Sequence, residues 1–67
     1  MDWVDGFTIN TRIDADTMTI SANREGLLSL ANFLIELAEE APGSHIHLDA
    51  DNSLEEGSME LIVERIQ

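Results

Sequence analysis

Apolar and polar residues alternate along two neighbouring stretches near the start of the chain. From Phe7 to Ile13 the apolar residues and Thr11 share one face, with polar residues between them. The same period of two returns from Thr17 to Ala22, after the turn-forming residues Asp14 to Asp16. Because this period is typical of half-buried strands, the pattern predicts two strands joined as an antiparallel hairpin.

A helical period follows the second strand. Asn23 is of a type that caps helices, Glu25 puts a negative charge in the first turn, and Pro42-Gly43 ends the pattern. On a helical wheel the predicted core-facing stripe is Leu27, Leu30, Ala31, Leu34, Ala38 and Ala41. The opposite face is polar, with Ser29, Asn32, Glu36, Glu39 and Glu40. Further apolar residues widen the stripe beyond the arc that one sheet face covers, namely Leu28, Phe33, Ile35 and Leu37.

Two more strands are predicted after the helix. Ser44 to Asp49 alternates, with Ile46 and Leu48 on one face and the polar side chains of His45, His47 and Asp49 on the other. A polar stretch from Ala50 to Ser58 separates it from a last strand, Met59 to Ile66. The order strand, strand, helix, strand, strand predicts an α+β fold, in which one amphipathic helix packs on a four-stranded antiparallel or mixed sheet.

The length and the absence of cysteine affect the expected stability. A chain of 67 residues without cysteine is expected to form a single domain, residues 1–67, stabilised by only about 3–5 kcal/mol and without disulfides. Residues 1–6 are predicted to be a loosely ordered segment, which lacks the features of a signal peptide. A small domain of this kind favours reinforcement by a partner or a second copy.

Charge excludes several classes of function. The 14 acidic residues exceed the 3 arginines, and the net charge is -11. We therefore expect no binding to nucleic acid and none to anionic membranes, since both require a basic surface. No apolar run approaches the roughly 20 residues of a membrane helix, so a cytoplasmic protein is expected. A net charge of this sign could simply maintain solubility, or it could steer the chain toward a basic protein.

The sequence offers little chemistry for catalysis or for a cofactor. His45, His47 and Asp49 share one strand face and could supply three metal ligands, although a solvated strand face explains the same pattern. The segment from Asp49 to Glu60 has spacings like those of a calcium loop, but Leu54 stands where the motif needs glycine. No serine lies in a nucleophile motif, so we expect no enzyme and no cofactor.

Three segments resemble a small immunity-protein family of bacterial polymorphic-toxin systems. They are EGLLSLANFLIELAEE (Glu25 to Glu40), HIHLD (His45 to Asp49) and LEEGSMELIVERI (Leu54 to Ile66). The resemblance implies an α+β fold and the neutralisation of a cognate toxin by direct binding, without catalytic residues. The alternative function is a small metal-binding or structural homodimeric module that uses His45, His47 and Asp49.

Two sets of residues are candidates for contacts. Acidic residues would meet a basic toxin, first those of the loop between the last two strands and then those of the helix: Asp49, Asp51, Glu55, Glu56, Glu36, Glu39 and Glu40. Apolar residues and the strand histidines would form a homodimer interface: Ile62, Ile66, Phe33, His45 and His47.

Overall fold

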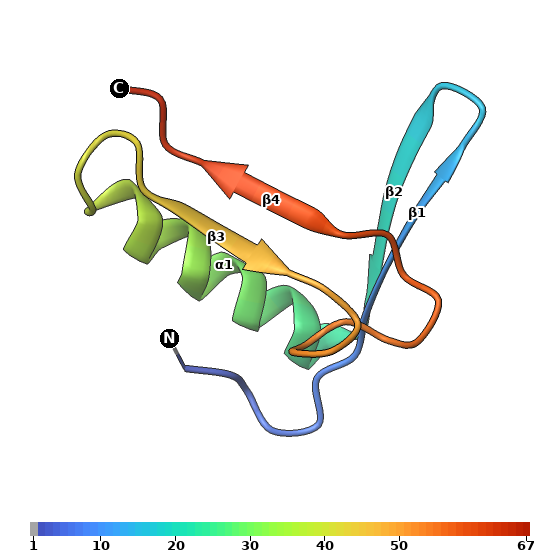
Figure 1. The fold of residues 1–67 in the computed structure, drawn as a ribbon. Helices are drawn as coiled ribbons and strands as arrows, with labels where there is room; N and C mark the ends of the chain where they lie inside the picture. The colour runs from blue at the N-terminus through green and yellow to red at the C-terminus, as the bar shows by residue number, and fades with distance from the viewer. Residues whose placement is uncertain (1) are drawn as a thin grey trace.

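The computed structural model describes residues 2–67 and contains one helix and four strands (Figure 1). In chain order they are β1 (Ile9–Asp14), β2 (Thr17–Ala22), α1 (Arg24–Ala38), β3 (His45–Leu48) and β4 (Leu61–Glu64). The α+β class and the order of elements are confirmed. The last strand is shorter than predicted at both ends, because only Leu61–Glu64 pair as strand residues.

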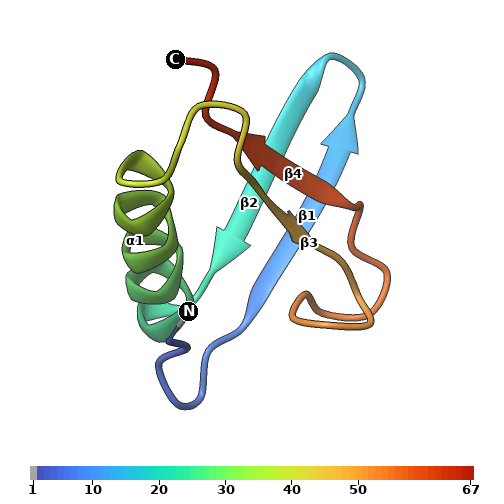
Figure 2. The ribbon, with the colours of Figure 1, turned by 60° about the vertical axis from the view of Figure 1, so that its left-hand side comes forward.

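The strands form two separate antiparallel pairs, so the prediction of one four-stranded sheet is wrong. β1 pairs with β2 from Ile9↔Ala22 to Asp14↔Thr17, and β3 pairs with β4 from His45↔Glu64 to Leu48↔Leu61. Figure 2 shows that the two pairs run in crossing directions. Each pair is too small to be stable by itself, so both depend on packing against α1 and each other.

The segment before β4 explains why the sheet is interrupted. Residues 55–59 lie along β1, where a paired strand would lie, but they make only isolated contacts with it. The backbone N–H groups of Glu55 and Met59 donate to the carbonyls of Ile9 (2.8 Å) and Thr11 (3.0 Å). Side chains make the other contacts: Ser58 Oγ accepts from the Thr11 N–H, and the Thr11 hydroxyl donates to the Met59 carbonyl. Side-chain hydrogen bonds therefore replace the backbone ladder at this junction.

The start of α1 is as predicted, whereas its buried face is not. Asn23 caps the helix, because its Oδ1 accepts from the Gly26 N–H at 2.7 Å. The buried residues of α1 are Gly26, Ser29, Phe33 and Leu37. Leu27 and Leu34 of the predicted stripe are instead 55% and 48% exposed. Small residues face the core because the chain passes close by: a Cβ on Gly26 would lie 2.3 Å from the Thr8 carbonyl oxygen.

Two residues of the expected N-terminal segment, Trp3 and Val4, contact the helix. The Trp3 ring stacks on Phe7 with centroids 4.3 Å apart and meets Phe33 edge-on at 4.2 Å. The Val4 N–H donates to Ser29 Oγ at 2.9 Å. Met1, the first residue of that expected segment, lies outside the described residues.

Two apolar clusters form the core on either side of Trp3. One contains the buried side chains of Ile9, Leu48 and Leu54, and the other contains Phe33, Leu37 and Ile46. Trp3 packs against both clusters, so it connects the two parts of the core. Within residues 2–67, the helix is too short and too polar to cross a membrane.

Candidate protein-binding surface

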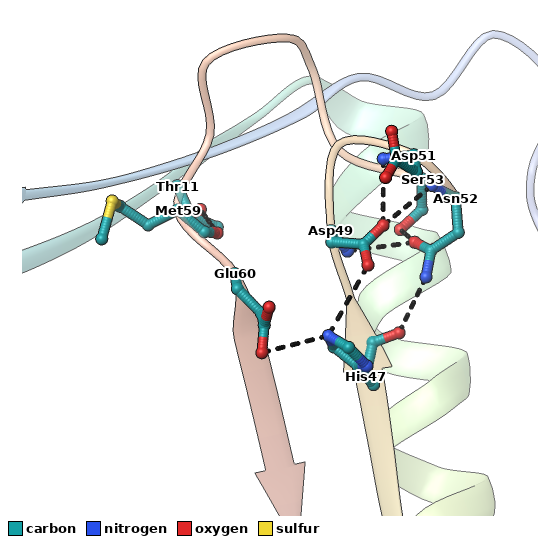
Figure 3. Close-up of polar contacts among 8 residues, drawn as sticks. All are labelled: Thr11, His47, Asp49, Asp51, Asn52, Ser53, Met59 and Glu60. Carbon is teal, nitrogen blue, oxygen red and sulfur yellow. Dashed lines mark hydrogen bonds and ion pairs between the residues drawn. The ribbon is translucent and has the colours of Figure 1, made fainter.

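The acidic loop after β3 is a folded turn. Asp49 Oδ1 accepts from the N–H groups of Asp51 (2.9 Å) and Asn52 (3.0 Å), as Figure 3 shows. The Asp49 carbonyl accepts from Ser53 and Leu54, whose side chain is buried in the core. Asp49 therefore holds the turn in shape, while its neighbour Asp51 is exposed.

Glu55 and Glu56 extend the acidic loop beyond the turn. Both side chains are exposed, and the backbone of Glu55 is tied to β1 through the Ile9 carbonyl. The loop consequently presents Asp51, Glu55 and Glu56 from a backbone that is held at both ends. A surface ordered before binding loses less conformational entropy when a partner docks on it.

A histidine joins this loop to the start of β4. His47 Nε2 lies 3.6 Å from Asp49 Oδ2 and 3.2 Å from Glu60 Oε1 (Figure 3). All three side chains are partly exposed. His45, two residues earlier, is opposite Glu64 in the register. Across residues 2–67 no three His, Asp or Glu side chains are arranged to hold a metal ion, so His45, His47 and Asp49 are not brought together as ligands.

The acidic candidates predicted on the helix lie around its C-terminal end, with Glu36 in the last turn and Glu39 and Glu40 directly after Ala38. Glu36, Glu39 and Glu40 are exposed. Glu36 and Glu40 also line a groove of about 460 Å³ between α1 and β3, with Phe33, Leu37, Ser44, His45 and Ile46. The Arg65 guanidinium donates to the carbonyls of Glu40 and Gln67, so it ties β4 to the helix end through backbone oxygen atoms.

Of the candidates for a dimer interface, His47 and Ile62 share the outer face of the β3–β4 pair, whereas Phe33 does not. Ile62 and Ile66 are 56% and 78% exposed, and His47 is opposite Ile62 on the outer face of the strand pair. Phe33 is fully buried in the core against Trp3. Phe33 is therefore enclosed by its own chain, apart from the exposed Ile62 and Ile66.

An exposed apolar surface lies on the β1–β2 hairpin. Ile13, Met18 and Ile20 are 54%, 71% and 47% exposed. The register places Ile13 opposite Met18 and Ile20 opposite Thr11, so these side chains share one face. They line a small groove of about 100 Å³ together with Met59 and Leu61. The alternation predicted this shared face, but only its half near Ile9 is covered.

Asn52 belongs to this surface, although it was not among the residues predicted from the sequence. Its Nδ2 donates to the His47 carbonyl and its Oδ1 accepts from the Asp49 N–H, both at 3.1 Å. The signal was present as an Asp-x-Asp-Asn run directly after a strand, since Asx side chains often bond nearby backbone groups.

Comparison with known proteins identifies a matching family. The sequence model of a family described as Immunity protein 32 matches residues 17–66, which is most of the chain. The three segments that carried the resemblance to immunity proteins all lie within this range. No curated protein and no solved structure matches the chain.

Proposed function

Because this chain belongs to the immunity protein 32 family, we propose that it neutralises a cognate bacterial toxin by binding it directly, without catalysis. The family match over residues 17–66 is the observation that carries the proposal. The toxin is a basic protein in this proposal, since a net charge of -11 attracts a positive surface and speeds its encounter. The cytoplasm is the compartment where the two proteins meet.

The contact surface consists of two acidic regions at the two ends of β3. The loop region contains Asp51, Glu55 and Glu56 beside the turn that Asp49 holds, and the helix region contains Glu36, Glu39 and Glu40. Both regions are exposed, and both stand on backbone that the fold orders. Long-range attraction from such regions raises the association rate more than it changes the dissociation rate.

Co-expression with the toxin encoded beside this chain tests the proposal. The wild-type chain protects the host cell and forms a complex with the toxin. Replacing Asp51, Glu55 and Glu56 by Lys slows association most at low salt, because screening removes the attraction at high salt. Asp5, Asp14 and Asp16, replaced by Lys, make a control with the same change in net charge outside both regions. Absence of both protection and a complex for the wild-type chain rejects the proposal.

We propose in addition that the chain forms a homodimer. The supporting observation is the number of large apolar side chains left exposed. They include Ile62 on β4, Ile66 shortly after it, and the hairpin residues Ile13, Met18 and Ile20. Clusters of exposed apolar side chains usually indicate protein interfaces. Sedimentation should show a dimer at micromolar concentration, which Ile62→Glu or Met18→Glu dissociates. A wild-type monomer under the same conditions contradicts the dimer.

A further inference from the structure

One edge of β3 is open. In an antiparallel pair, alternate residues direct their backbone groups toward the partner strand. The Arg65 N–H donates to the Ser44 carbonyl at 2.9 Å, so Ser44, Ile46 and Leu48 face β4. His45 and His47 then direct their N–H and C=O groups to the opposite edge. Among residues 2–67, no other strand pairs with β3 on that side.

The Asn52 side chain confirms this direction and closes one end of the edge. Its amide accepts from the Asp49 N–H and donates to the His47 carbonyl, which is what the backbone of a neighbouring strand would do. The His45 N–H, the His45 carbonyl and the His47 N–H remain, and within the described chain the register gives them no partner. Unpaired groups in this arrangement are a template for an added strand.

A groove lies beside the open groups. Its volume is about 460 Å³, its lining includes the buried side chains of Phe33, Leu37 and Ile46, and Glu36 and Glu40 also contribute to it. Alternate side chains of a strand added to β3 would project on the Ile46 side, toward α1. The groove lining is partly apolar and partly carboxylate. The side chain of arginine or lysine suits this lining, because it has an apolar stem that ends in a cation.

We propose that the open edge of β3 captures an extended segment of the toxin as an additional strand, with an arginine or lysine of that segment in the groove near Glu36 and Glu40. This mode of recognition obtains affinity from backbone hydrogen bonds and specificity from the pocketed side chain. The inference rests on the proposed function, because it assumes that a basic toxin is the partner.

The open edge does not suit a second copy of this chain. The chain has no lysine and 3 arginines. Arg65 is already bonded to the Glu40 and Gln67 carbonyls, and Arg12 donates to Ser21 on the distant hairpin. Arg24 is the first residue of α1 and so does not belong to an extended segment. Two copies joined through β3 would also bring their acidic grooves together, and like charges at an interface are unfavourable. The occupant is therefore a basic chain.

A proline at position 45 tests the edge directly. His45→Pro removes the N–H that faces the open edge and keeps the ladder to β4, because proline is tolerated where the missing N–H points away from the sheet. Asp5→Pro is the matched control: Asp5 occupies the second position of the turn closed by the Phe7 N–H on the Val4 carbonyl, where proline is favoured. Circular dichroism verifies that both variants fold.

The binding of each variant is measured by calorimetric titration with a catalytically inactive form of the cognate toxin. His45→Pro should weaken binding by about tenfold or more, and Asp5→Pro should change it by less than about twofold. Glu36→Gln combined with Glu40→Gln should also weaken binding and reduce its salt dependence. A folded His45→Pro variant that binds like the wild type overturns the inference, whereas a wild-type chain that does not bind the toxin overturns the proposed function instead.

Hydrogen exchange provides an answer even if the proline variant fails to fold. The amides of His45 and His47 are followed by nuclear magnetic resonance in the isotopically labelled wild-type chain. The unlabelled toxin should slow the exchange of both amides, since a bonded edge exchanges only when the added strand opens. Unchanged exchange in a formed complex rejects strand addition. Slow exchange in the chain alone that depends on its own concentration assigns the edge to a second copy and also overturns the inference.

Discussion

Two small residues on the buried face of α1 determine how closely the helix approaches the rest of the chain. Ser29 is fully buried, and its hydroxyl accepts from the Val4 N–H at 2.9 Å and donates to the Glu25 carbonyl at 2.8 Å. Gly26 leaves room for the Thr8 carbonyl and the Ala22 side chain. The N-terminal segment and the hairpin thus meet the helix through residues with almost no side chain.

Ser29→Ala should destabilise the protein by about 1–3 kcal/mol, because the Val4 N–H loses its acceptor in a place where the hydroxyl is enclosed. Ser21→Ala is the matched control, since Ser21 is exposed and its hydroxyl accepts a hydrogen bond from the exposed Arg12 guanidinium. The control should change the free energy of unfolding by less than about 0.5 kcal/mol. Urea unfolding followed by Trp3 fluorescence measures both, and equal effects would contradict the role given to Ser29.

Gly26→Ala should destabilise the protein although alanine is the better helix former. The higher helix propensity of alanine contributes about 1 kcal/mol. The added Cβ would stand 2.3 Å from the Thr8 carbonyl oxygen and 3.0 Å from Ile9 Cγ1, and overpacking of this kind costs about 1–3 kcal/mol. Asn32→Ala, on the exposed side of α1, should instead be neutral or slightly stabilising. A Gly26→Ala variant more stable than the wild type would show that the close approach is absent.

At the scale of elements, local sequence patterns predicted the features that depend only on residues close together in the chain. The hairpin, the Asn23 cap and the order of elements follow from alternation, from a capping side chain and from Pro42-Gly43. The buried face of α1 depends on residues far away in the chain, and a hydrophobicity pattern cannot show that Gly26 and Ser29 face a close backbone. It favoured Leu27 and Leu34 instead because they are larger and more apolar.

Only part of the sheet arrangement and part of the candidate site could be predicted from the sequence. At the interruption, hydrogen bonds from the side chains of Ser58 and Thr11 replace backbone ladder bonds. Neither residue type indicates this in the sequence. The exposure of Asp51, Glu55 and Glu56 follows from their charge, as expected. The open edge of β3 could not be predicted from the sequence, since it depends on which strands pair and on where the Asn52 amide lies.

The N-terminal segment acts as part of the core at this scale. Trp3→Ala should remove about 3 kcal/mol, at the low end for such truncations because Trp3 is half-buried. A small domain holds only about 3–5 kcal/mol in total, so much of the variant should be unfolded at 37 °C. Far-ultraviolet circular dichroism against temperature measures this. A variant with the thermal midpoint of the wild type would show that residues 1–6 are dispensable.

Over the whole molecule, negative charge opposes folding while it favours a basic partner. The net charge is -11 and the chain contains 3 arginines, so carboxylates repel one another across a structure only 31 × 30 × 19 Å in extent. Raising the sodium chloride concentration from 0.01 to 0.5 M shortens the Debye length from about 30 Å to a few ångström. The thermal midpoint of the free chain should therefore rise with salt. A midpoint that falls over this range would contradict net repulsion.

The same negative charge favours the complex with a basic toxin, although it destabilises the free chain. Attraction between an acidic inhibitor and a basic toxin is strongest where salt is lowest, whereas the free chain is least stable there. Binding and stability should consequently respond to salt in opposite directions, provided that the chain remains folded throughout the range.

The most direct measurement is the association rate constant of the wild-type chain with its cognate toxin as a function of ionic strength, by stopped-flow fluorescence of Trp3. The two proteins should form a complex whose association rate falls by about tenfold or more between 0.01 and 0.5 M salt, with a much smaller change in the dissociation rate. A chain that forms no complex with the toxin, or one that associates at a rate independent of salt, would contradict neutralisation by an acidic surface that binds a basic toxin.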